Sequence, residues 1–225
     1  MDLRSIRDKV YDEIHLDILR GDLLQGQRIS VGDFAERFNI SPQPVRDAVI
    51  RLAEEGLLQV HPRRGTFVTT ITAERIAEIN AAREMMETFA LERANMSGHP
   101  DAWQTIEESL LEMTTIRSRA QYNYLDYNAQ DFRFHLATVM LSGNATITAM
   151  YSKLHPHYLY AMVMYNFATT SLGKHEDHAR IVEMLKKGDF AAAATVAATH
   201  TRKATDHLLA LMQKPTATDR PGASA

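Results

Sequence analysis

The sequence contains no cysteine, which excludes disulfide bonds, thiolate metal sites and cysteine nucleophiles. Any bound metal must therefore be held by aspartate, glutamate or histidine, and the chain has 10 histidines. It also lacks an apolar run of the roughly 18 residues that a membrane span needs. The first residues lack the apolar core of a signal peptide. We therefore expect a cytoplasmic protein with no membrane partner.

A strong excess of positive charge is also missing. The 225 residues carry a formal net charge of −3, and the first 70 contain ten basic and eleven acidic residues. This balance argues against a uniformly basic surface, although a local basic cluster can still bind DNA. Hydrophobic residues make up 45% of the chain and charged residues 24%, which is typical of globular proteins. The length favours two domains.

The first 70 residues contain three predicted short helices and one hairpin, since apolar residues recur first at helical and then at strand spacing. The expected helices cover residues 6–20, 30–39 and 41–56. Ser30 and Ser41 are suitable N-caps, and the prolines after Ser41 are tolerated because they fall in the first helical turn. Strand-like alternation is confined to residues 57–70, around a turn that contains Gly65.

This order of elements predicts a winged helix-turn-helix domain over residues 1–70, whose third helix enters the major groove of DNA. The expected core residues of that helix are Val45, Ala48, Val49 and Leu52. The expected DNA-binding residues are Gln43, Arg46 and Arg51 on the helix, with Arg63, Arg64 and Gly65 in the wing. Arg46 and Gln43 can reach base edges or phosphate, whereas Arg51 suits the phosphate backbone. The alternative is an ordinary solvated charged face.

Beyond residue 70 the pattern changes to long amphipathic helices, which predict a mainly α fold with an antiparallel all-helical bundle at residues 71–213. The expected helices cover residues 73–96, 101–120, 125–141, 145–167, 175–187 and 190–212. The tail at residues 214–225 has no apolar periodicity, and we expect it to be disordered.

Four polar residues of the helical part are expected to point inward together. Asp131 and His135 are four residues apart and share one helical face, while His178 and His200 lie on otherwise apolar stripes. Three imidazoles and a carboxylate are costly to bury unpaired but favourable around a divalent cation. Each histidine taken alone is more simply a hydrogen-bonded core residue. From spacing alone, the competing ligands are His155, His157, His175 and His207.

Arg83 interrupts the apolar stripe of the first long helix, so its guanidinium is expected to face the bundle interior. It can form an ion pair with Glu87, or it can clamp the carboxylate of a ligand whose other oxygens reach the metal. Asn144 follows Gly143 at a helix end, where it can serve simply as a turn residue. For Arg83, the sequence leaves both the ion pair and the ligand contact open.

The segment SVGDFAERFNISPQPVRDAVIRLAEEGLLQVHPRRGTFV resembles the operator-binding domain of GntR-family bacterial regulators, over about residues 6–68. The resemblance implies that Arg46 and the wing residues Arg63, Arg64 and Gly65 contact operator DNA. One position departs from the family pattern, because Pro42 stands where relatives commonly have arginine. One expected DNA contact is therefore missing, and an operator preference cannot be transferred.

Two later segments, DFRFHLATVMLSGN and EDHARIVEMLKKGDFAAAATVAATH, resemble the FCD effector domain of the FadR subfamily. The resemblance implies a divalent metal bound by Asp131, His135, His178 and His200. It also implies effector contacts from Arg83 and, through the SGN motif, a supporting role for Asn144. Small organic acids are common effectors of such domains.

The sequence as a whole predicts a one-component transcription regulator that is not an enzyme. We expect a homodimeric repressor that binds double-stranded operator DNA and responds to a small carboxylate in a metal-containing cavity. Zinc is the first expectation for the metal, with nickel or manganese as alternatives. The competing hypotheses are a metal-dependent hydrolase on a helical scaffold and a DNA-binding regulator whose metal is purely structural.

Overall fold

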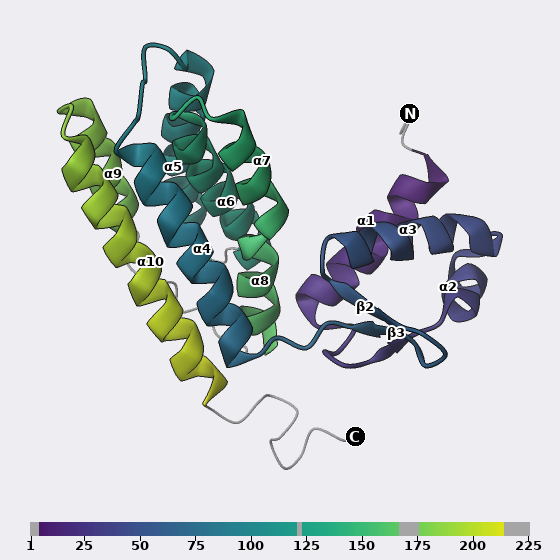
Figure 1. Cartoon of the computed structure of the whole chain (residues 1–225). Helices are drawn as coiled ribbons and strands as arrows, with labels where there is room; N and C mark the ends of the chain where they lie inside the picture. The colour runs from purple at the N-terminus through teal and green to yellow at the C-terminus, as the bar shows by residue number, and fades with distance from the viewer. Residues whose placement is uncertain (1–4, 121–122, 167–175, 214–225) are drawn as a thin grey trace. The chain divides into compact units, whose positions relative to one another are not determined.

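The structure is a computed structural model that describes residues 5–120, 123–166 and 176–213. The chain divides into two compact units, Met1–Ile71 and Thr72–Ala225 (Figure 1). The predicted mainly α fold is confirmed. The disorder predicted for residues 214–225 concerns a segment that lies outside the described residues.

The amino-terminal unit contains three helices and a small sheet. The helices are α1 (Ile6–Arg20), α2 (Val31–Phe38) and α3 (Pro42–Glu54). The Ser30 hydroxyl accepts a hydrogen bond from the backbone of Asp33, and Asn39 ends α2 in the left-handed conformation. Pro42 occupies the first turn of α3, where a missing N–H costs nothing. These residues set the short turn between α2 and α3.

The sheet has three strands, one more than the predicted hairpin. The strands are β1 (Arg28–Ile29), β2 (Leu58–His61) and β3 (Gly65–Val68), in the order β1-β3-β2. All pairing is antiparallel, with Arg28 opposite Phe67 and Val60 opposite Thr66. The expectation that strands are confined to residues 57–70 was therefore wrong. A strand of two residues is too short to show an alternating pattern.

The carboxy-terminal unit is built from helices only, among the residues that the structure describes. They are α4 (Ala73–Leu91), α5 (Pro100–Ser118), α6 (Tyr124–Met140), α7 (Ala145–Leu154), α8 (Pro156–Asn166), α9 (Glu176–Lys186) and α10 (Phe190–Met212). Helix α10 packs along α4 and α9, and α5 packs along α6 (Figure 1). The predicted antiparallel helical bundle is thus present.

Two predicted helices end or break earlier than expected. The helix predicted for residues 145–167 is divided by His155, which is left-handed and precedes Pro156. Proline disfavours a helical conformation in the residue before it and cannot donate a backbone hydrogen bond. The helix predicted for residues 73–96 ends at Leu91, and Asn95 beyond it donates its backbone N–H to Leu141 instead.

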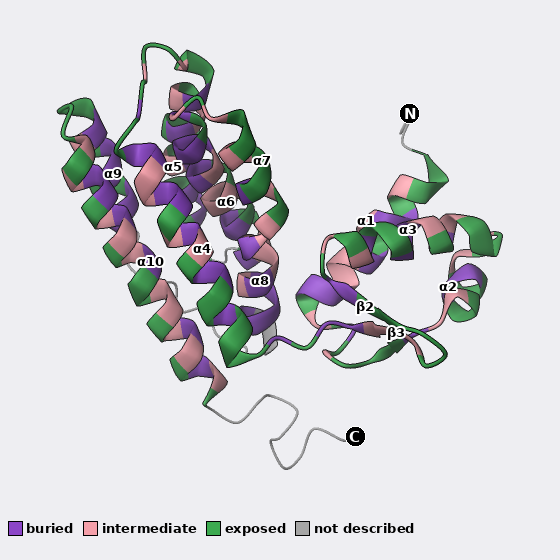
Figure 2. Ribbon diagram, viewed as in Figure 1, coloured by how far each residue is buried: buried purple, intermediate pink, exposed green. Residues whose placement is uncertain are grey.

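The core of the bundle lies where α5, α6, α9 and α10 meet. Its fully buried side chains include Ile106, Met113, Phe134, Ile181 and Leu185. In Figure 2 the buried residues follow the sides of these helices that face their neighbours. Burial of each large aliphatic or aromatic side chain contributes about 1.5–3 kcal/mol to stability. This apolar core fixes the positions of α6, α9 and α10, which carry Asp131 and three of the histidines.

Candidate metal centre, cavity and nucleic-acid surface

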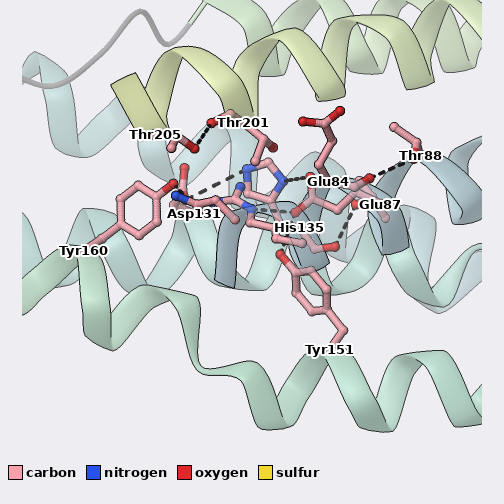
Figure 3. A network of polar contacts seen from close by, with 12 residues as sticks. Glu84, Glu87, Thr88, Asp131, His135, Tyr151, Tyr160, Thr201 and Thr205 are labelled. Carbon is pink, nitrogen blue, oxygen red and sulfur yellow. Dashed lines mark hydrogen bonds and ion pairs between the residues drawn. The ribbon is translucent and has the colours of Figure 1, made fainter. Parts of the chain in front are cut away.

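Asp131, His135, His178 and His200 converge inside the helical unit. Asp131 and His135 lie one turn apart on α6, His178 lies on α9 and His200 lies on α10. Each residue offers one donor atom, and these four atoms all lie within 4.8 Å of one another. Figure 3 shows Asp131 and His135 at the centre of the polar network. The four residues expected to share a site are therefore brought together.

The closest contacts within the cluster join nitrogen and oxygen atoms that are typical metal ligands. Nε2 of His178 lies 3.1 Å from Nε2 of His135 and 3.0 Å from Oδ1 of Asp131. His135 and His178 are buried, and the side chain of His200 is 14% exposed. Two imidazole nitrogens facing each other need either a shared proton or a cation between them.

The protonation states of the cluster suit a metal. Burial, together with nearby His178, lowers the pKa of His200 to about 4. Burial and the Arg83 guanidinium also lower the pKa of His135. Burial alone would raise the pKa of Asp131, but His135 and His178 outweigh it and hold the pKa well below its usual range. Neutral His135 and His200 and an ionised Asp131 are the forms that metal binding requires.

The donor set fits a divalent transition metal. Zinc is bound by imidazole nitrogen and carboxylate oxygen at about 2.0–2.2 Å, commonly by four ligands. Nickel and manganese accept the same donor types, usually with more ligands. Asp131, His135, His178 and His200 would hold such an ion, and a metal with five or six ligands would keep room for a further oxygen.

Arg83 forms the predicted ion pair with Glu87. Nε of Arg83 donates to Oε1 of Glu87 at 2.7 Å, and both side chains are buried. Tyr151 donates its hydroxyl proton to the same oxygen at 2.6 Å (Figure 3). Nη2 of Arg83 is also buried but has no hydrogen-bond partner among the described residues. The ion pair therefore uses Nε of the guanidinium and leaves Nη2 available.

A cavity of about 350 Å³ adjoins the cluster. Its wall includes Asp131, His178 and His200 at the cluster and Arg83 beside them. Further along, the wall is formed by Tyr124, Tyr127, Asn128, Tyr160, Met164, Asp177, Lys203, Ala204, His207 and Leu208. Such a volume accommodates a small organic molecule next to the candidate metal ligands.

Several cavity residues were not anticipated from the sequence. Asp177 lies 3.2 Å from Nζ of Lys203 and 3.8 Å from Nδ1 of His200. Hydrogen bonds from His200 and Lys203 hold the pKa of Asp177 below its usual range. The position of Asp177 directly before His178 gave no signal, because adjacent residues on a helix do not share one face. Asp177 thus supports His200 from outside the cluster.

Asn144 and the four competing histidines lie outside the cluster of Asp131, His135, His178 and His200 wherever the structure describes them. The Asn144 side chain accepts a hydrogen bond from the backbone of Ile147 and caps α7. Asn144 is not among the residues that line the cavity, so its effector contact stays a prediction. The cluster does not include His155 or His157. His207 lines the cavity, and His175 lies outside the described residues.

The exposed face of α3 carries the predicted DNA-binding residues of that helix. Gln43 and Arg46 are exposed, whereas the expected stripe of Val45, Ala48, Val49 and Leu52 is buried. The Gln43 amide donates to Oδ1 of Asp47 at 2.8 Å. This bond fixes the amide orientation on the exposed face. Ile50 is 57% exposed on the same helix and adds an apolar side chain to this face.

Arg51 is exposed as well, and it also has partners within the protein. Its guanidinium lies 3.7 Å from the ring centre of Tyr11, and its Nε lies 3.2 Å from Oε1 of Glu55. Tyr11 also donates its hydroxyl proton to Glu55. These contacts connect α1 to α3. A DNA contact by Arg51 stays a prediction, and the observed role is structural.

The wing concentrates positive charge at the turn between β2 and β3. Arg63 and Arg64 are exposed, and Arg63 and Gly65 both have positive φ angles, of 64° and 111°. A side chain at Gly65 would come within 3.0 Å of the Arg28 guanidinium, so glycine lets Arg28 lie against the turn. Arg28 lies on β1, and the prediction missed it because it missed that strand. It adds a third arginine to this surface.

No helix in the described part of the chain is long and apolar enough to cross a membrane. Two family models match the sequence. The model of bacterial regulatory proteins of the gntR family matches residues 6–68, and the model of the FCD domain matches residues 78–203. Together they span both structural units.

Individual relatives of the chain are also transcription regulators. An HTH-type transcriptional regulator in an unstable DNA locus of Streptomyces ambofaciens is 26% identical, over 91% of this chain and 86% of its own length. The gluconate operon transcriptional repressor of Bacillus licheniformis is 28% identical, over 78% of this chain and 70% of its own. The solved structure of Escherichia coli McbR/YncC is 19% identical with a TM-score of 0.71, covering 93% of this chain and 100% of that chain. This last likeness concerns the fold alone.

Proposed function

Because the chain belongs to the GntR family of bacterial transcription regulators and carries an FCD domain, we propose that it is a homodimeric repressor released from operator DNA by a small organic acid. Its family and relatives are transcription regulators and not enzymes, so the hydrolase hypothesis is discarded. The Bacillus licheniformis relative is a gluconate operon transcriptional repressor, which supports the direction of regulation proposed here.

The amino-terminal unit would bind the operator through α3 and the wing. Arg46 and Gln43 would reach base edges or phosphate from the exposed face of α3. Arg28, Arg63 and Arg64 would bind phosphate, which supplies affinity without sequence preference. One recognition helix reads too few base pairs to define a site in a genome, so two copies would bind a pseudo-palindrome.

The dimer hypothesis has a direct test. Light scattering of the free protein should give twice the chain mass of 25.4 kDa. Footprinting on the DNA upstream of its own gene should protect two half-sites about one helical turn apart, or a multiple of that distance. A monomer that protects one asymmetric half-site would contradict both expectations.

The effector hypothesis depends mainly on one observation, the buried Nη2 of Arg83. This atom has no hydrogen-bond partner among the described residues, and Arg83 lines the same cavity as the cluster. A guanidinium binds a carboxylate through two parallel hydrogen bonds, and Nη2 offers the donors for such a contact. A metal held by Asp131, His135, His178 and His200 would supply a second positive charge for the acid. Because Glu87 already compensates Arg83, an anion in the cavity would balance the remaining charge of the metal and accept the hydrogen bonds that Nη2 offers.

Coupling to DNA would be a shift between two populations of the dimer. An acid changes operator affinity only as far as it binds the DNA-competent and incompetent arrangements with different affinity. Arg83 lies on α4, the helix that directly follows the DNA-binding unit in the chain. Helix α4 is therefore the shortest connection along the chain through which a ligand in the cavity could affect that unit.

A purely structural metal is the remaining alternative, since four protein ligands already complete a tetrahedral shell. Fluorescence anisotropy with the upstream DNA would separate the two hypotheses. Metal-loaded and EDTA-treated protein would each be titrated with acetate, lactate and citrate after a thermal-shift screen. We expect an acid to weaken operator binding by the metal-loaded protein only. Metal-loaded protein whose melting temperature and operator affinity no acid changes would indicate a structural metal.

A further inference from the structure

The cavity extends along two helices, away from the candidate metal centre. On α10, His200 lies at the cluster and His207 lies seven residues further on, so the two are separated by about 10 Å along the helix axis. On α6, Asp131 and Tyr124 are likewise seven residues apart and both line the cavity. The space is thus elongated, with its far end between Tyr124 and His207.

The middle of the cavity has mainly apolar walls. Tyr127 on α6 and the small Ala204 on α10 lie between the two ends along their helices, and the lining residues Tyr127, Met164 and Leu208 are buried. A short acid such as acetate would leave this part unfilled. Aromatic side chains favour stacked or edge contacts with a flat ring, so the walls suit a flat apolar group.

The far end offers a hydrogen bond without a free positive charge. Nε2 of His207 is buried and has no hydrogen-bond partner among the described residues. Lys203 is nearby in the wall, but Asp177 lies 3.2 Å from its Nζ and compensates its charge. A buried polar atom without a partner destabilises the protein until a ligand or water satisfies it. A neutral polar group on the ligand suits this position better than a second carboxylate.

We propose that the effector is an elongated hydroxy acid: a carboxylate at the Arg83 end, a flat apolar body, and a hydroxyl at the opposite end that hydrogen-bonds to Nε2 of His207. This inference depends on the proposed effector function, and it adds the residue that selects among acids. Arg83 determines that the ligand is an acid, whereas His207 determines which acid is preferred.

Calorimetry on zinc-loaded, full-length protein tests the proposal with trans-4-hydroxycinnamate and trans-cinnamate, which differ by one terminal hydroxyl. We expect the hydroxylated acid to bind about tenfold more tightly, the usual effect of one buried hydrogen bond. In His207→Leu this ratio should fall to about one, since leucine cannot form the bond. His207→Gln keeps a donor and an acceptor and should preserve part of the preference. Asp206→Ala, at the exposed neighbouring position, is the matched control and should preserve all of it.

Three results would overturn the proposal. The first is an unchanged tenfold ratio, within about a factor of two, in both His207 variants. The second is tighter binding of octanedioate than of hydroxycinnamate, which would show that the far end of the cavity prefers a second carboxylate to a hydroxyl. The third is binding of acetate without binding of either cinnamate, which would exclude the apolar body but leave the proposed function intact. If no acid binds zinc-loaded protein, the proposed function itself fails as well.

Discussion

Glu87 lies against His135 with Oε2 3.2 Å from Nδ1, and both side chains are buried. Burial alone would raise the pKa of Glu87, but Arg83 and His135 outweigh it and keep the carboxylate ionised. An ionised carboxylate only accepts hydrogen bonds, so this contact favours the His135 tautomer that carries its proton on Nδ1. In that tautomer Nε2 keeps its lone pair and can bind a metal.

Replacing Glu87 with glutamine should weaken metal binding by about 10–100-fold, the usual range for a residue that orients a metal-binding histidine. Glutamine keeps the volume, but it removes the charge that fixes the His135 tautomer and compensates Arg83. Competition with a chelator measures the affinity. Glu84→Gln is the matched control, since Glu84 lies on the same helix and pairs with Arg202 outside the cluster. Equal affinities for both variants and the unaltered protein would exclude this role.

Removal of a ligand should release the metal and its contribution to stability. For His135→Ala and His200→Ala we expect much less metal by elemental analysis. With metal at about one hundred times its Kd, the loss of binding lowers the free energy of unfolding by about 3 kcal/mol. EDTA-treated unaltered protein is the reference and should melt near the temperature of the His200 variant. His61→Ala, in the other unit, should retain the metal. Full metal content in both ligand variants would reject the site.

Helical periodicity made the cluster predictable, because an inward direction follows from spacing along a single helix. Asp131 and His135 are four residues apart, and His178 and His200 each continue an apolar stripe. The sequence alone left these two histidines open to a core role, since spacing does not say which helices pack together. Only the packing of α6, α9 and α10 brings the four donor atoms within 4.8 Å of one another.

The features that could not be predicted depend on contacts between residues that are distant in the chain. Tyr11 and Arg51 are forty residues apart, and no local pattern indicates their contact. Tyr151 reaches Glu87 from another helix in the same way. Strand β1 has two residues and owes its conformation to its pairing with β3. The break at His155 and Pro156, by contrast, was readable from the proline and was overlooked.

Arg46 and Arg64 should differ in how they affect DNA binding. Arg46→Ala should weaken specific operator binding by about 1–3 kcal/mol if the guanidinium reads a base edge. Arg64→Ala should weaken binding to all sequences and reduce the salt dependence by about one unit of slope, because it removes one phosphate contact. Gel-shift titrations of operator and unrelated DNA at several salt concentrations distinguish the two effects. Unchanged operator affinity in both variants would reject this surface.

Arg51→Ala should act on the stability of the amino-terminal unit. The substitution removes the contact with Tyr11 and the ion pair with Glu55. A cation–π contact at a partly exposed site contributes about 0.5–1 kcal/mol, and the lost packing of the side-chain stem adds to it. Hydrogen exchange at the backbone amides of α1 and α3 should become faster. A reduced salt dependence of DNA binding with unchanged exchange would instead assign Arg51 to the phosphate backbone.

Arg83 is best tested with lysine, since Arg83→Ala would leave the buried Glu87 carboxylate without its main positive partner and destabilise the bundle. Lysine keeps one positive charge for Glu87 but cannot offer the second arm of a guanidinium to a ligand. We expect Arg83→Lys to bind the regulating acid at least about tenfold more weakly, because the charge-assisted hydrogen bonds from Nη2 are lost. Calorimetry on metal-loaded protein measures this affinity, with metal content determined on the same sample. If the variant binds the acid as tightly as the unaltered protein, Arg83 serves only as the ion-pair partner of Glu87, and the acid must be held by other residues of the cavity.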